Sequence, residues 1–141
     1  MASSDRGDAR ADVELRLPAC RAYASVLRTT AAALVARLDF TIDDIEDVRI
    51  AIGEATTLVL EEADPGADLV CGFRLGDQAV DITLSTGALG DPGPDRDSFA
   101  WQLLDALAPG VWAGSSGGVF TVRFTMSSVT AVDAGGGRRG R

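Results

Sequence analysis

The chain has 141 residues and a mass of 14.6 kDa, enough for one domain that buries a hydrophobic core without metals or disulfides. Its 46% apolar and 24% charged residues indicate a globular protein, and its net charge of −8 disfavours direct binding to nucleic acid or to anionic membranes. The absence of histidine excludes Ser-His and Cys-His catalytic pairs within this chain.

Polar ends frame the predicted domain. Residues 1–11 and the Gly/Arg-rich residues 131–141 have little apolar surface to bury and are expected to be disordered, which leaves a single domain over 12–130. No apolar run approaches the roughly 20 residues that span a bilayer, and the N-terminus has no apolar signal core. The sequence therefore predicts a cytoplasmic protein.

The two cysteines, Cys20 and Cys71, are too few and too far apart in the sequence to form a zinc site. We expect both to be reduced, partly buried small apolar residues. The alternative, a redox pair, requires a favourable Cα geometry.

The first predicted elements are a strand and a helix. Val13, Leu15 and Leu17 alternate with charged residues and predict a half-buried strand that stops at Pro18. Residues 21–38 have helical periodicity, with Arg28 and Arg37 on the exposed side. The expected inward side chains of this helix are Tyr23, Val26, Leu27, Thr30, Leu34 and Leu38.

Residues 41–64 predict one long helix. Thr41 and the carboxylates that follow it favour a helix start, and Pro65-Gly66 prevents continuation. A second row of this helix, separate from most of the buried stripe, contains Glu54, Leu58 and Glu61. The buried stripe is expected to contain Ile45, Val48, Ile52, Ala55 and Val59.

The remaining chain predicts four strands and one helix. Residues 68–75 and 78–85 flank Gly76-Asp77, which is typical of a hairpin turn. Residues 87–97 are dense in Gly, Pro and Asp and predict a loop, a short strand starts at Val111-Trp112, and residues 119–127 alternate as a final strand.

Ser98 is expected to cap the last helix, whose inward side chains are predicted to be Phe99, Leu103, Ala106 and Leu107, with Trp101 left undecided. The order of elements predicts an α+β two-layer sandwich, with helices on one face of a mostly antiparallel sheet.

The run IEDVRIAIGEATTLVLEEA, residues 45–63, resembles the N-box helix of the RsbW/SpoIIAB-like anti-sigma factors, serine kinases with the histidine-kinase-like (GHKL) ATPase fold. The resemblance covers about residues 12–127 and implies that fold. It also implies that Glu54 is the catalytic residue, which polarises the attacking hydroxyl. Leu58 falls where the family has a magnesium-binding Asn, and a Leu side chain offers no oxygen ligand.

The glycine motifs that hold ATP in this family are altered here. In the family's Asp-x-Gly-x-Gly segment the Asp binds adenine, and the matching positions carry Thr86, Ala88 and Gly90. The second motif, Gly-x-Gly-Leu, corresponds to the start of the last helix, where Asp97, Phe99 and Trp101 disfavour phosphate. We therefore expect no metal site and no bound cofactor.

The resemblance leaves three functions open. The first is an anti-sigma factor that sequesters a stress or sporulation sigma factor until an anti-anti-sigma (STAS-type) protein competes, with Arg28 as a partner contact and a homodimer as the expected assembly. The second is a serine/threonine kinase that phosphorylates its anti-anti-sigma antagonist with ATP and magnesium, with Glu61 replacing the missing ligand. The third is a sensor of a nucleotide or second messenger.

Overall fold

The structure, a computed structural model, describes residues 10–128. The predicted C-terminal tail and residues 1–9 of the predicted N-terminal tail lie outside this range. Five strands form one antiparallel sheet in the order β1-β2-β3-β5-β4. The strands are β1 (Val13–Pro18), β2 (Asp68–Gly76), β3 (Ala79–Gly87), β4 (Trp112–Ser116) and β5 (Val119–Ser127).

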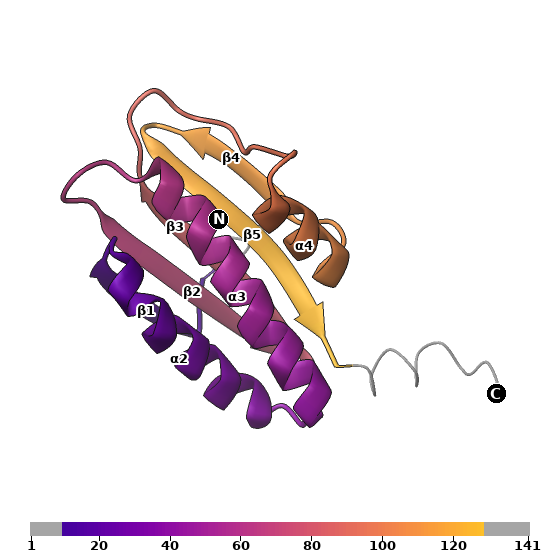
Figure 1. The fold of residues 1–141 in the computed structure, drawn as a ribbon. Coiled ribbons are helices and arrows are strands. Elements are labelled where there is room, and N and C mark those ends of the chain that lie inside the picture. The colour runs from indigo at the N-terminus through magenta and orange to yellow at the C-terminus, as the bar shows by residue number, and fades with distance from the viewer. Residues whose placement is uncertain (1–9, 129–141) are drawn as a thin grey trace, which may run out of the picture.

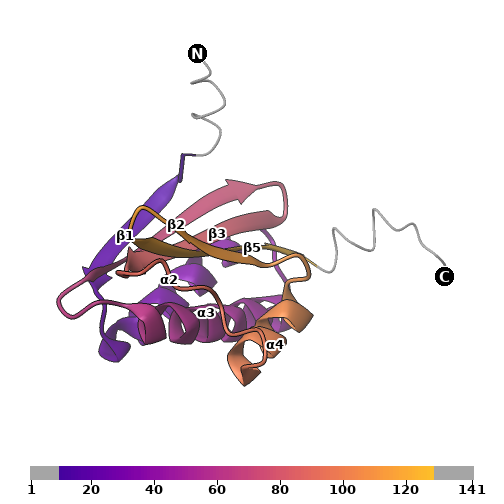
Figure 2. The same ribbon diagram turned by 90° about the horizontal axis from the view of Figure 1, so that it is seen from above.

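Three helices cover one face of this sheet (Figures 1 and 2). They are α2 (Ala24–Ala36), which follows a short 3-10 turn, η1 (Arg21–Tyr23), then α3 (Ile42–Glu62) and α4 (Phe99–Leu107). The predicted α+β two-layer sandwich is confirmed. Within residues 10–128, no helix combines the length and the apolar character that crossing a bilayer requires.

The core lies between the sheet and the helices because the strand side chains alternate. In β3, Val80, Ile82 and Leu84 are buried on the helix side, whereas Asp81 and Thr83 lie on the other face. The same alternation places Leu69 and Phe73 of β2 and Phe120, Val122 and Phe124 of β5 in the core.

Helix α3 is the central element of the helix layer, between α2 and α4 (Figure 1). Its start is capped as predicted, because the Thr41 hydroxyl accepts a 3.1 Å hydrogen bond from the Asp44 N–H. The predicted stripe is buried at Val48, Ile52, Ala55 and Val59, and Ile45 is half-buried. The helix with the clearest start, stop and periodicity in the sequence is thus the helix at the centre of the helix layer.

The predicted inward face of α2 is confirmed in part. Leu27 is buried, and Leu34 and Leu38 are half-buried and pack against the core. The fully buried row nevertheless continues from Leu27 through Ala31 and Val35, and Tyr23 and Val26 are exposed. Both rows recur at helical spacing, so periodicity alone did not separate them. Ala31 lies in the buried row, and α2 packs against α3.

The predicted inward face of α4 is also displaced. Phe99 is 76% exposed and Ala106 is exposed, whereas Ala100, Trp101 and Leu104 are buried. Leu103 and Leu107, which were predicted to point inward, are half-buried. Trp101, left undecided by the sequence, is therefore a core residue, and its larger surface sets the side that α4 turns to α3.

Candidate functional site

A surface hollow of about 240 Å³ between α2 and α3 brings together two predicted site residues, Arg28 and Glu54. Both are half-buried. Arg28 lies against α3 at Gly53, where an added Cβ would be 3.8 Å from Cδ and Nη1 of Arg28, an ordinary van der Waals distance. The sequence placed Arg28 on an exposed helix side and did not predict its position beside Glu54.

The rest of the hollow is lined by Glu46, Arg49 and Ile50. Arg49 Nε lies 3.8 Å from Glu46 Oε1, so these two side chains form a loose ion pair. The hollow thus contains two guanidinium groups, two carboxylates and one partly exposed aliphatic side chain. Such a set suits polar and charged side chains of a protein partner better than a small apolar ligand.

The row of Glu54, Leu58 and Glu61 does not form one surface. Leu58 is only 3% exposed and belongs to the hydrophobic core, whereas Glu61 is exposed. Leu58 therefore contributes packing at the position where the family resemblance implies a metal ligand. An aliphatic group offers no oxygen to a hard cation.

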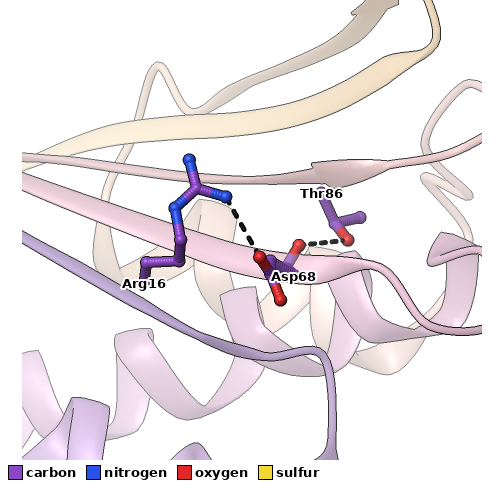
Figure 3. A network of polar contacts seen from close by, with 3 residues as sticks. All are labelled: Arg16, Asp68 and Thr86. Atoms are coloured by element: carbon purple, nitrogen blue, oxygen red, sulfur yellow. Dashed lines mark hydrogen bonds and ion pairs between the residues drawn. The ribbon is translucent and has the colours of Figure 1, made fainter.

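Thr86 is buried, and its hydroxyl is engaged by the protein itself. Thr86 Oγ1 donates a 2.8 Å hydrogen bond to the backbone carbonyl of Asp68, while the Asp68 carboxylate accepts a 3.2 Å bond from Arg16 Nη1 (Figure 3). Asp68 thereby connects β1 with β3. The Thr86 hydroxyl thus donates its proton to a hydrogen bond between β3 and β2.

The turn after β3 also satisfies its own backbone groups. The N–H of Ala88, a fully buried residue, donates to the Gly118 carbonyl at 2.8 Å, and the N–H of Leu89 donates to the Asp64 carboxylate at 3.0 and 3.1 Å. Gly90 follows with φ +86°. Asp64 is a residue that sequence reasoning missed, because no local pattern connects it with a turn 25 residues away.

The loop that leads to α4 is attached to the β4–β5 hairpin. The Asp91 carboxylate accepts a 2.9 Å hydrogen bond from the Gly118 N–H, and the Ser115 hydroxyl donates to the Pro92 carbonyl. Ser98 caps α4 as predicted and accepts a 3.1 Å bond from the Trp101 N–H. The Ser98 side chain therefore caps the first turn of α4.

Two groups have displaced pKa values. Burial raises the pKa of the Asp47 carboxyl above its ordinary value of 3.8, and the charges of Asp44, Asp43 and Glu46 raise it further. Burial also raises the pKa of the Cys71 thiol to about 12. Both cysteines are free thiols, as predicted, and Cys71 is buried. The predicted partial burial of Cys20 is wrong, because this residue is exposed.

The antiparallel sheet, the covering helices and the central α3 together define a domain with the histidine-kinase-like ATPase fold. A crystal structure of the RsbU and RsbW domains of a Mycobacterium tuberculosis protein supports this class. It matches with a TM-score of 0.57 and 20% identity, over 82% of this chain and 32% of that one.

Sequence comparison finds relatives that are more similar to this chain than the structural match is. Serine-protein kinase RsbW of Halalkalibacterium halodurans is 33% identical over 98 residues, 69% of this chain and 56% of that protein. RsbW of Bacillus thuringiensis is 41% identical over 75 residues, 52% of this chain and 47% of that protein. The chain thus matches about half the length of these relatives, and no family model matches it. The chain is therefore similar to the RsbW proteins, the resemblance that the α3 sequence predicted.

Proposed function

We propose that this protein is a cytoplasmic anti-sigma factor. It binds an alternative sigma factor of the stress or sporulation type and releases it when an anti-anti-sigma protein of the STAS type competes. In this proposal it acts as a homodimer, and its ATP binding and kinase activity are lost or weak. The observation that carries the proposal is the burial of Leu58 in the core of an RsbW-like domain.

The side chains of Leu58 and Thr86 argue against binding of magnesium and ATP at the positions where the family resemblance implies it. Leu58 has no oxygen for the metal, and filling that place with another residue would disturb the core. Thr86 has no carboxylate for adenine, and its hydroxyl proton is donated to the Asp68 carbonyl. The residues present therefore do not fit Mg-ATP, and we derive no phosphoryl transfer step for this chain.

The hollow between α2 and α3 supports the capture of a protein. Arg28 and Arg49 are cationic groups on a chain of net charge −8, and Arg28 lies next to Gly53 of α3. The surrounding negative field attracts a basic partner such as the DNA-reading helices of a sigma factor, while the arginines pair with that partner's carboxylates. Arg28 is the proposed contact residue.

The experiment measures the binding of a panel of alternative sigma factors to the immobilised protein. Arg28→Glu should weaken binding roughly tenfold or more, equivalent to about 1.4 kcal/mol. Arg37→Glu is the matched control because it makes the same charge change at the exposed C-terminal end of α2, and it should bind like the wild type. Absence of binding to every sigma factor would remove the proposal.

The second candidate function is an active serine/threonine kinase. It is favoured by the names of the relatives and by the accessible carboxylate of Glu54 in the hollow. Calorimetric titration with ATP and magnesium separates the two candidates. The kinase would be established if ATP binds at millimolar concentration, if Glu54→Gln leaves this binding intact, and if the same substitution abolishes phosphate transfer. No heat of binding would leave the anti-sigma function.

A further inference from the structure

Arg28 and Glu54 carry opposite charges and line the same hollow between α2 and α3. Both side chains are half-buried. Within residues 10–128, neither side chain makes a hydrogen bond or an ion pair. Partial removal of a charged group from water costs free energy unless an opposite charge or a hydrogen bond replaces the water. Each of these two groups therefore gains stability from an opposite charge that another molecule brings into the hollow.

Arg49, the second cation of the hollow, already has a partner. Its Nε lies 3.8 Å from Oε1 of Glu46, one turn earlier on α3. Among the described residues that line the hollow, the unpaired charges are thus one guanidinium on α2 and one carboxylate on α3. Ile50 lies one turn before Glu54 on the same side of α3 and is 37% exposed, so an apolar contact is available beside the carboxylate.

The carboxylate of Glu54 has no chemical step in the proposed function, because Leu58 and Thr86 do not fit Mg-ATP. A carboxylate also acts by binding, since it accepts hydrogen bonds from lysine and arginine side chains that are roughly twice as strong as bonds between neutral groups. On a chain of net charge −8, long-range attraction draws any basic protein. A carboxylate and a guanidinium in fixed places select among such proteins.

We propose that Glu54 is a specificity-determining residue of this hollow. Its carboxylate takes a lysine or arginine of the captured protein, while Arg28 takes a carboxylate of the same segment. The inference rests on the proposed function and assigns Glu54 a role in binding. A protein with carboxylates at both places, or with basic groups at both, meets one like charge and is rejected.

A single helix of the partner has the dimensions to supply both charges. The axes of two packed helices, such as α2 and α3, lie about 8–10 Å apart. Side chains one to two turns apart on a helix are separated by about 5–11 Å along its axis. A partner helix that crosses α2 and α3 therefore reaches Arg28 with an acidic side chain and Glu54 with a basic one.

The first test removes the charge of Glu54 and keeps its shape. Glu54→Gln should weaken binding roughly tenfold, measured without nucleotide against the sigma factor of the panel that binds the wild type most tightly. Glu61→Gln is the matched control, because it makes the same change on α3 at an exposed position outside the hollow. It should change the affinity less than about twofold. Circular dichroism verifies that both variants are folded.

The outcomes of this test separate the role of Glu54 from the proposed function. A folded Glu54→Gln variant that binds like the wild type overturns the inference and leaves the anti-sigma function standing. Absence of wild-type binding to every sigma factor overturns both. A role of Glu54 in catalysis alone predicts unchanged binding, because no phosphate donor is present in the measurement.

The second test identifies the partner's charges by double-mutant cycles. Each lysine and arginine of that sigma factor is changed to alanine and measured against the wild type and against Glu54→Gln. One basic position should be coupled to Glu54 by roughly fivefold or more in affinity, and one acidic position should be coupled in the same way to Arg28, measured with Arg28→Gln. The two positions should lie on one helix of the sigma factor. Additive effects of Glu54→Gln with every basic substitution would contradict the pairing.

Salt distinguishes a direct contact from the general attraction of an acidic protein. A charge pair that loses its water on binding is screened much less than exposed charges are. The effect of Glu54→Gln should therefore persist in high salt, whereas the small effect of Glu61→Gln should disappear. If both effects disappear together, position 54 acts only through the net charge, and the inference is wrong.

Discussion

The Thr86 hydroxyl and the Asp68 backbone carbonyl form a 2.8 Å hydrogen bond that joins the start of β2 to the end of β3. This bond gives Thr86 a structural role at the position where the family resemblance implies adenine recognition. Because Thr86 is buried, its hydroxyl has little access to any ligand. At this position the chain has a threonine whose hydroxyl makes a contact within the sheet.

Substitution of Thr86 tests this role. Thr86→Val should lower the free energy of unfolding by about 1 kcal/mol, because the Asp68 carbonyl loses its donor. Thr86→Asp should be more destabilising, because it buries a carboxylate next to a carbonyl oxygen without a donor. Urea denaturation measures both, with Thr29→Val at an exposed helix position as the matched control. An aspartate variant as stable as the wild type would show that the site admits a charge.

Leu58→Asn restores the family's metal-binding residue type and should reduce stability. Removing most of a buried leucine and adding an amide without partners should cost about 3 kcal/mol or more. Leu58→Met keeps the volume and should cost less than about 1.5 kcal/mol. Both values come from denaturant unfolding curves. An asparagine variant that unfolds at the wild-type denaturant concentration would place position 58 outside the core.

Asp47→Asn should stabilise the protein at neutral pH. The pKa of Asp47 is raised in the folded state, so folding favours its protonated form. The resulting penalty is present above the folded pKa and disappears as the pH falls below the ordinary value of 3.8. The gain from the substitution should be roughly 0.2–0.5 kcal/mol at pH 7, the size of one like-charge helix pair, and should shrink towards acid pH.

Thermal unfolding at neutral and acid pH measures this dependence. Asp105→Asn on α4 removes the same charge away from the acidic first turns of α3 and serves as the control. High salt should reduce the gain at position 47, since salt screens repulsion between accessible carboxylates. A gain that grows as the pH falls would contradict the assignment.

The two thiols should differ in reactivity. At pH 8 a thiol reagent should modify Cys20 rapidly and leave Cys71 unmodified, because Cys71 is buried and its pKa is about 12. Both thiols should react in denaturant. Cys20→Ser should abolish the rapid phase, and mass spectrometry identifies the modified residue. Rapid labelling of Cys71 in the folded protein would indicate an opening that the structure lacks.

The local elements were predictable from the sequence because their signals are local. The Thr41 cap and the Pro65-Gly66 stop fixed the limits of α3 to within two residues. Alternation identified β1 and β5, and the hairpin turn at Gly76-Asp77 identified β2 and β3. The family resemblance rested on the same helix, and the comparisons confirm it. The inward phase of α4 was wrong and that of α2 was only partly right, because each helix carries two apolar rows and only its neighbours determine which row is covered.

The sequence by itself determined the α+β order of elements, a central helix that resembles that of the RsbW family, and a leucine at the position where this resemblance implies a metal ligand. Only the tertiary structure decided that this leucine is in the core, that Thr86 bonds to Asp68, and that Arg28 lies beside Glu54. The physical reason is the distance along the sequence over which each kind of interaction acts. Caps and periodicity act between residues a few positions apart, whereas these contacts join residues 18 or more positions apart, whose approach depends on how sheet and helices pack.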